Sequence, residues 1–153
     1  MLLFRSRLVH CGLLFLFSAL FAFGSCSSAS GPAFSAASMP NAGECGIYLY
    51  RRGAIAAYGQ KFTVLVDGRQ AGFLANASYL HLPLTPGSHL LQIAPGGIAS
   101  PSSLRINAAT GARQFYEFVF PTGLAMRPSF PGAAIEARTE PEALTRLNGL
   151  RLM

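Results

Sequence analysis

The chain of 153 residues has few of the residue types that enzymes use for catalysis. It has no tryptophan, six acidic residues, three histidines and three cysteines. The motifs G-x-S-x-G and H-E-x-x-H and a phosphate-binding loop are all missing. General acid–base catalysis needs a positioned pair of titratable groups, and the sequence shows none. We therefore expect a protein that is not an enzyme, with no catalytic, cofactor-binding or metal-binding residues.

Charged residues are also scarce and scattered. They make up 12% of the chain, and the net charge is +6. Arg51-Arg52 is the only adjacent basic pair. A nucleic-acid-binding surface would gather its basic residues on one face or helix, so we expect no nucleic-acid partner. The mild positive charge is compatible with weak attraction to anionic lipid headgroups or envelope polymers.

No apolar run is long enough to cross a membrane, since a spanning helix needs about 20 apolar residues. The run from Leu13 to Phe23 has eleven residues, and Arg5 and Arg7 precede it. Gly24-Ser25 and then Cys26 follow. This order of a positive start, an apolar run and small residues predicts a secretory signal peptide over residues 1–25.

With Cys26 at the cleavage point, the N-terminus resembles a bacterial lipoprotein signal. In that class the thiol of the first mature residue is acylated, which predicts palmitate on Cys26 and a lipid anchor in a membrane. Ser27 stands where enterobacterial lipoproteins retained at the inner membrane carry aspartate. The resemblance therefore implies the cell envelope, at the outer membrane and facing the periplasm. Small residues in 27–37 also offer sites to the ordinary signal peptidase, which would leave no lipid.

Cysteine use in the mature chain depends on this processing. If Cys26 carries a lipid, Cys45 is the single free cysteine, and a Cys26–Cys45 disulfide is possible only without the lipid. Cys45 begins an apolar strand, where a free cysteine usually acts as a small buried hydrophobic residue. We expect Cys45 to be buried.

Two regions follow the predicted signal. Residues 26–43 consist mostly of Ser, Ala, Gly and Pro, with almost nothing to bury, and this composition predicts a lipidated, flexible tether. Residues 44–153 then form one domain of short apolar segments separated by Gly, Pro and Asn. This pattern predicts a mainly β fold, a single β-sandwich of about seven short antiparallel strands. The expected strands cover 45–51, 61–66, 69–74, 78–84, 88–93, 104–107, 114–120 and 133–138.

The domain is expected to end in a short helix. Thr139 and Glu142 fit a capping box, in which the threonine and the glutamate satisfy the free N–H groups of the first turn. Leu144 and Leu147 then share one face, and Gly149 suits the end of the helix.

Two turns are assigned structural roles. Asp67-Gly68 is a dipeptide typical of a type I′ hairpin turn. A two-residue turn there would pair Val64 with Ala71 and Phe62 with Phe73, and place these side chains on one apolar face.

Pro86-Gly87 marks the second turn. We expect it to join another hairpin, in which Leu82 pairs with Leu91 and Leu80 with Ile93. In this register His81 and His89 point to opposite sides of one sheet, so they would not share a metal ion. His89 is then expected near the turn, bonded to backbone.

Glu117 is the one acidic residue without an obvious local role. It lies between Phe115 and Val119, on the strand face opposite Tyr116 and Phe118. A carboxylate on an apolar face must be paired or lie at an interface. We expect an arginine partner.

Several short segments carry a further resemblance. They are Gly46-Ile47-Tyr48-Leu49-Tyr50-Arg51, Val64-Leu65-Val66-Asp67-Gly68, Gly72, Tyr79 and Pro86-Gly87-Ser88-His89. Over about residues 44–150 the chain resembles the uncharacterised bacterial lipoproteins of domain-of-unknown-function family twenty-eight forty-six. Its turn motifs are similar to surface-associated modules of the PEGA type. The resemblance implies a β-sandwich lipoprotein and no known activity.

Three functional hypotheses remain open. The first is a membrane-anchored, non-catalytic binding or structural module that contacts an envelope protein or polymer. Outward residues such as Leu65, Leu90 and Phe115 would supply its binding face, unless loops or the helix cover them. The second is a periplasmic carrier of a small apolar ligand or lipid, held between the Phe62–Val66 and Phe118–Phe120 faces. The third is a hydrolase whose unrecognised site would gather Glu117, a histidine and a hydroxyl.

Overall fold

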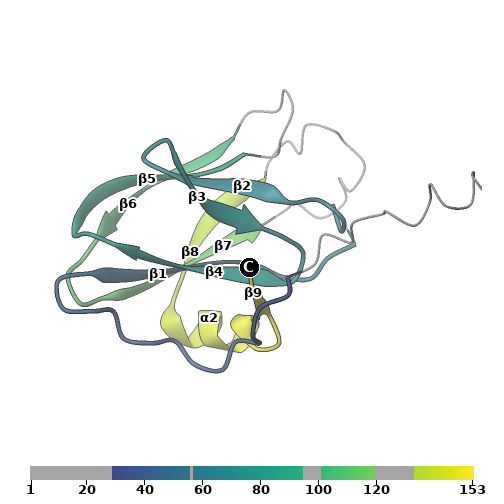
Figure 1. The fold of residues 1–153 in the computed structure, drawn as a ribbon, viewed down its shortest axis with the longest axis horizontal. Helices are drawn as coiled ribbons and strands as arrows, with labels where there is room; N and C mark the ends of the chain where they lie inside the picture. Colours follow the sequence, from purple (N-terminus) through teal and green to yellow (C-terminus); the bar gives the residue numbers. More distant parts are fainter. Residues whose placement is uncertain (1–28, 56, 95–100, 120–132) are drawn as a thin grey trace, which may run out of the picture.

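A computed structural model describes residues 29–55, 57–94, 101–119 and 133–153. The predicted signal peptide, Cys26 and Phe120 lie outside the described residues. The described chain is mainly β, as predicted, and forms two packed sheets with a short helix near the C-terminus (Figure 1). Its elements are β1 (Cys45–Arg51), β2 (Phe62–Val66), β3 (Arg69–Leu74), β4 (Ser78–Leu84), β5 (Gly87–Ala94), β6 (Ser102–Ala108), β7 (Arg113–Val119), β8 (Ala134–Arg138), α2 (Glu140–Leu147) and β9 (Arg151–Leu152).

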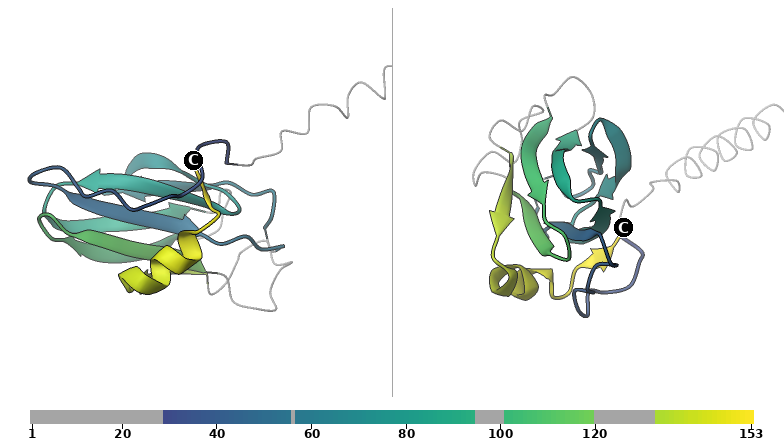
Figure 2. Two further views of the ribbon diagram at one scale, coloured as in Figure 1. Left: turned by 90° about the horizontal axis from the view of Figure 1, so that it is seen from below. Right: turned by 90° about the vertical axis from the view of Figure 1, so that its left-hand side faces the viewer.

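The two sheets have different strand orders. The first is five-stranded, in the order β8-β7-β1-β4-β9, and the second is four-stranded, in the order β3-β2-β5-β6. Helix α2 lies on the outer side of the five-stranded sheet (Figure 2). Most neighbouring strands are antiparallel, but β1–β7 and β4–β9 are parallel. The expectation of antiparallel strands was therefore wrong for β1 and β7, and β9 is a strand that the sequence did not predict.

The β2–β3 hairpin turns where predicted but has a different register. A bulge between Val64 and Leu65 makes Ala71 the extra residue of β3. Phe62 therefore pairs with Leu74 rather than with Phe73. Leu74 is buried, whereas Ala71 and Phe73 are exposed. The expected apolar face was wrong beyond the bulge, because one extra residue exchanges the two faces of a strand.

The expected β4–β5 hairpin does not form. Strand β4 pairs with β1 and β9, whereas β5 pairs with β2 and β6 in the other sheet. Thr85-Pro86-Gly87 carries the chain from one layer to the other, with Gly87 at φ +135°. The predicted pairs Leu80–Ile93 and Leu82–Leu91 were wrong as ladder partners. All four residues are nevertheless buried in the core between the sheets.

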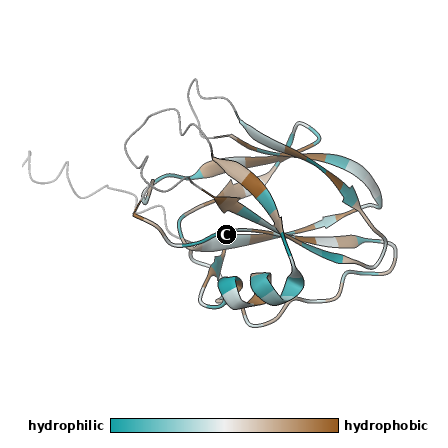
Figure 3. Cartoon of the chain, turned by 180° about the vertical axis from the view of Figure 1, so that it is seen from behind, coloured by the Kyte–Doolittle hydropathy of each residue, from teal (hydrophilic) through white to brown (hydrophobic). Residues whose placement is uncertain are grey.

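The core fills the space between the sheets. Phe62, Val64, Leu91 and Ile93 of the four-stranded sheet are completely buried, and the rings of Phe62 and Phe118 meet edge to face at 5.1 Å. Cys45 is buried and free, as predicted. Figure 3 shows apolar segments along the strands and a mostly hydrophilic α2. The helix accordingly buries only Ala143 and Leu147.

Residues 29–43 pack against the domain along its edge and outer face, whereas the sequence predicted a segment with almost nothing to bury. Gly31 N–H donates to Leu152 O at 3.0 Å, and Phe34 N–H donates to Leu150 O at 2.8 Å. The Phe34 ring meets Tyr79 edge to face at 5.4 Å. Residues 31, 34, 37 and 40 are partly buried, whereas those between them are exposed. This spacing of three gives an extended segment one contact side.

Candidate functional site

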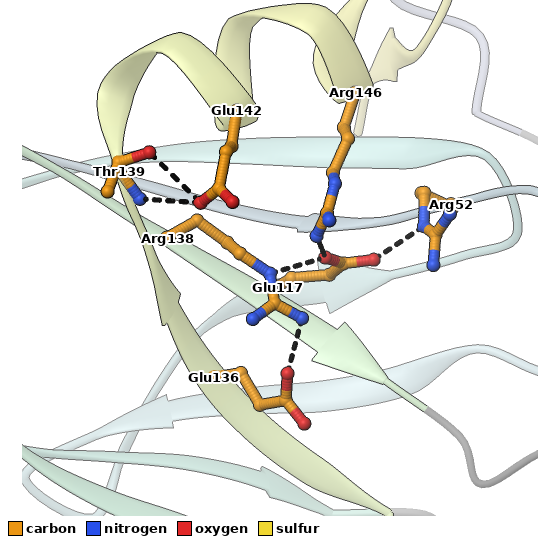
Figure 4. Close-up of polar contacts among 7 residues, drawn as sticks. All are labelled: Arg52, Glu117, Glu136, Arg138, Thr139, Glu142 and Arg146. Carbon is orange, nitrogen blue, oxygen red and sulfur yellow. Dashed lines mark hydrogen bonds and ion pairs between the residues drawn. The ribbon is translucent and has the colours of Figure 1, made fainter.

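A buried carboxylate lies on the outer face of the five-stranded sheet. Glu117 is the fifth residue of β7, and its side chain is only 1% exposed. Its neighbours across the sheet are Glu136 on β8 and Tyr50 on β1. The alternation of β7 directs Tyr116 and Phe118 into the core and Glu117 away from it. Helix α2 covers this place (Figure 4).

Three arginines bind Glu117, which confirms the predicted pairing. Arg52 Nε donates to Oε1 at 2.6 Å, and Arg138 Nε donates to Oε2 at 2.9 Å. Arg146 donates to Oε2 as well. Arg52 directly follows β1, Arg138 is the last residue of β8, and Arg146 lies in α2. The carboxylate therefore joins the helix and two strands through charge-assisted hydrogen bonds.

Local structure positions the arginines. Arg138 also binds Glu136, which relieves the repulsion between the neighbouring carboxylates Glu136 and Glu117. The next residue, Thr139, is the N-cap of α2, and its N–H donates to Glu142 Oε2 at 3.3 Å. The Thr139 hydroxyl donates to the same oxygen at 2.9 Å. The predicted capping box is thus present, and it sets the direction from which α2 delivers Arg146.

The arginines keep the Glu117 carboxylate ionised. Burial acts to raise its pKa, but hydrogen bonds from Arg138, Arg52 and Arg146 outweigh burial, and the pKa lies below the ordinary glutamate value. The neighbouring Tyr50 hydroxyl is buried, and burial, with the nearby Glu117 charge, raises its pKa. Glu117 is therefore held as an anion and Tyr50 as a neutral phenol. Such a cluster stabilises packing and is poorly suited to donate a proton.

An aromatic layer continues from this cluster along the same outer face. The Tyr48 ring stacks between His81 at 4.6 Å and Phe115 at 5.3 Å. Burial lowers the pKa of His81. Phe34 covers Tyr48, and α2 packs over the same group of residues. Phe115, expected as part of an exposed binding face, is thus buried, while Leu65 and Leu90 are half-buried on the other sheet.

Asp67-Gly68 forms the predicted hairpin turn between β2 and β3, whereas Pro86-Gly87 connects the two sheets instead of closing a hairpin. Asp67 and Gly68 both have positive φ, at 51° and 76°. Asp67 Oδ1 accepts from Leu90 N–H at 2.8 Å, and Oδ2 lies 2.7 Å from His89 Nδ1. His89 Nε2 lies 2.8 Å from Thr85 O, so His89 is bonded to backbone as expected. Asp67 and His89 thereby connect the β2–β3 turn to the Pro86-Gly87 crossing.

The structure separates the groups that a hydrolytic site would bring together. His81 is on β4 and His89 on β5, in different sheets, so the argument that placed them on opposite faces of one sheet was wrong. The partners of the Glu117 carboxylate are arginines. Among the described residues, no group of three His, Cys, Asp or Glu side chains is placed to hold a metal ion.

Two spaces bear on ligand binding. The region proposed for an apolar ligand, between the Phe62 and Phe118 faces, is occupied by the contacting rings themselves. An open groove of about 660 Å³ lies between the N-terminal segment and α2. The residues that line this groove include Arg113 and Glu140, which form an ion pair, and the apolar side chain of Leu144.

Comparisons with known proteins add no functional assignment. No family model matches the sequence, and neither curated proteins nor solved structures gave a match. In the part of the chain that the structure describes, no helix has the length and apolar character needed to span a membrane.

Proposed function

We propose that this protein is a membrane-anchored lipoprotein of the cell envelope that acts as a non-catalytic binding or structural module. The observation that carries the proposal is the N-terminal sequence, in which a short apolar run is followed by Gly24-Ser25-Cys26. The resemblance to uncharacterised bacterial lipoproteins agrees with it. The lipid on Cys26 would be the contact with the membrane, and an envelope protein or polymer would be the further partner.

The side chains of the folded domain support a non-catalytic role. The buried acid, Glu117, is neutralised by three arginines, and Asp67 and His89 bind each other and nearby backbone. These groups already have partners in the folded chain. Because they fix turns and the helix, their chemistry is used to hold the fold.

The anchor is tested by replacing Cys26 with alanine and following labelled palmitate in cells. We expect label on the natural protein and none on Cys26→Ala. Undiminished label on the variant would refute acylation at Cys26. If the host has two membranes, fractionation should place the protein in the outer one, and recovery in the inner membrane would contradict the role assigned to Ser27. Crosslinking in the intact envelope would then identify the partner.

A further inference from the structure

The connection between β1 and β2 exposes two large apolar side chains. Ile55 is 94% exposed and Tyr58 is 69% exposed, so neither contributes much to the core. Arg52 and Lys61 flank them and are also exposed. An exposed aliphatic residue, a tyrosine and two cations in one segment match the chemistry of a membrane interface. There tyrosine lies at headgroup level and cations contact anionic lipids.

The backbone of this segment is held from inside the protein. The buried Arg51 guanidinium donates to Ala57 O at 2.8 Å and to Gln60 O at 3.2 Å. Tyr58 N–H donates to Ile55 O at 3.2 Å, and Ala54 N–H donates to Asn76 Oδ1 at 3.0 Å. The segment is thus fixed to the domain on its inner side, while Ile55 and Tyr58 remain exposed.

The first described residues lie at the same end of the sandwich. Arg51 pairs with Ser78, Ser78 pairs with Arg151, and Arg151 bridges to Ala33. Neighbouring strands are about 4.8 Å apart, so this row spans about 15 Å. The β1–β2 connection is at the right-hand end of the sandwich in Figure 1.

The distance to the proposed anchor is short. Ala29 is buried, and it follows Cys26 by only three residues. Two residues further on, Gly31 N–H donates to Leu152 O of the domain at 3.0 Å. Three residues reach at most about 11 Å. A lipid on Cys26 would therefore hold this end of the sandwich at the membrane surface rather than at the end of a long tether.

The charges at this end complement an anionic surface. Lys61 and Arg151 are exposed there, and the exposed Arg52 already binds Glu117. Of the acidic residues that the structure describes, Glu117 and Glu136 are bound by arginines. Of the others, Glu44 contacts the β6–β7 turn, Asp67 lies in the β2–β3 turn, and Glu140 and Glu142 are in the first turn of α2.

We propose that Ile55 and Tyr58 dock in the headgroup region of the anionic phospholipid membrane that holds the lipid of Cys26, and that Lys61 and Arg151 contact its phosphates. This proposal rests on the proposed lipid anchor. It assigns the domain a fixed orientation, with the β1–β2 connection on the membrane and the β2–β3 and β6–β7 turns directed away from it.

The chain offers a clean fluorescence probe, because it contains no tryptophan. The variants Tyr58→Trp and, as the control at the opposite end, Thr110→Trp are made in the full chain and purified as the lipidated protein. Thr110 lies in the exposed β6–β7 turn. Each is incorporated into vesicles of phosphatidylethanolamine and phosphatidylglycerol with brominated acyl chains. We expect the emission of the Tyr58→Trp protein to shift to shorter wavelength and to be quenched, and that of the Thr110→Trp protein to do neither.

The ionic part is tested with a matched pair of charge variants in the Tyr58→Trp background. Lys61→Gln should weaken docking about five-fold, since each basic residue near an anionic surface contributes about that factor. Arg69→Gln, at the first residue of β3 beside the turn at the opposite end, should leave docking unchanged. Vesicles made of phosphatidylcholine alone have no net charge, so the Lys61→Gln and Arg69→Gln proteins should both dock more weakly on them. Quenching that is equal in these vesicles and in the anionic ones would refute the ionic contacts.

Two failures can be told apart in the same preparation. Suppose that mass spectrometry shows the lipid and the protein floats with the vesicles, but the Tyr58→Trp protein is quenched no more than the Thr110→Trp protein. The docking proposal is then wrong and the anchor stands. Docking through this end to a protein would give that result. If Cys26 carries no lipid, both proposals are overturned, because the orientation depends on an anchor close to Ala29.

Discussion

Replacing Glu117 tests most directly what holds α2 on the outer face of the five-stranded sheet. Replacing it with glutamine removes the charge that binds Arg52, Arg138 and Arg146. Hydrogen bonds to charged groups contribute about 1.5–3 kcal/mol, and the arginines are partly exposed, so water can solvate them in part. We expect Glu117→Gln to lower the free energy of unfolding by about 2–3 kcal/mol in urea denaturation. Glu136→Gln is the matched control, with an expected cost below about 1 kcal/mol because Glu136 is 44% exposed. Equal costs would contradict the central role of Glu117.

The same residue predicts a dependence on acid. The pKa of Glu117 is lower in the folded protein than in the unfolded chain, where it is about 4.3. Its stabilisation is therefore complete above that unfolded value and is lost as the pH falls through the folded pKa. The difference in unfolding free energy between the natural protein and Glu117→Gln should shrink as the pH is lowered below about 4. A difference that stays constant down to the acid transition would refute the lowered pKa.

The two histidines that the structure describes, His81 and His89, should titrate on opposite sides of the ordinary value, about 6.5. Hydrogen bonds to Asp67 and to Thr85 O raise the pKa of His89, whereas burial lowers the pKa of His81. The stabilisation from His89 is complete below its unfolded pKa and is lost as the pH rises through the raised folded pKa. NMR titration should show the order directly. Asp67→Asn keeps the turn and an acceptor for Leu90 N–H but removes the charge, so the pKa of His89 should fall while that of His81 stays. An unchanged pKa of His89 in this variant would contradict the ion pair between Asp67 and His89.

At the scale of an element, the β2–β3 turn should fail through its backbone. Gly68 has φ +76°, and a Cβ there would meet no atom within 4 Å, so space is not the constraint. A β-branched residue tolerates positive φ badly, and Gly68→Val should cost about 1–3 kcal/mol. Gly68→Asn is the matched control, since asparagine tolerates the left-handed region, and its cost should be well below that of valine. The melting temperatures of the two variants test this prediction. An equal decrease for Gly68→Val and Gly68→Asn would mean that the positive φ is not the cause of the lost stability.

Strand positions were predictable from the sequence because short apolar runs end at Gly, Pro and Asn. Which strands pair with one another, and in which register, was harder to predict. Ala71 is an extra residue that no local pattern distinguishes from its neighbours, and the bulge moved Leu74 into the core in place of Phe73. The turn at Pro86-Gly87 is as compatible with a crossing between sheets as with a hairpin. What decides is that β1 and β9 occupy both edges of β4, and those contacts are distant in the sequence.

The candidate site, too, was predictable only in part. The need for an arginine at Glu117 follows from one strand, because a carboxylate on an apolar face requires a partner. Which arginines supply it depends on how β8 and α2 fold back, so three partners from three elements could not be named. The exposed Ile55 and Tyr58 were also missed, since the sequence alone does not say which apolar residues stay outside.

At the scale of the whole molecule, the segment before β1 belongs to the folded body. Its packing limits how far the domain could stand from the lipid that we propose on Cys26. Phe34 is its main anchor, since its ring meets Tyr79 at 5.4 Å and Tyr48 at 6.2 Å, edge to face in both contacts. Aromatic contacts of this kind contribute about 0.5–1.5 kcal/mol each beyond the buried area.

Phe34→Ala should therefore release the segment and lower the free energy of unfolding by about 1–3 kcal/mol. Limited proteolysis should cut residues 29–43 much faster in this variant, while the strands stay intact. Met39→Ala is the control on the same segment, and because Met39 is 69% exposed its effect should stay within about 0.5 kcal/mol. If Cys26 carries the proposed lipid, release would also lengthen the link between lipid and domain from three residues to seventeen, from Cys26 to Gly43. When Phe34→Ala is added to the lipidated Tyr58→Trp protein, quenching should then fall, because a longer link lowers the effective concentration of the docking surface at the membrane. Faster proteolysis with undiminished quenching would show that docking does not need the short link, and slow proteolysis would show that Phe34 does not hold the segment.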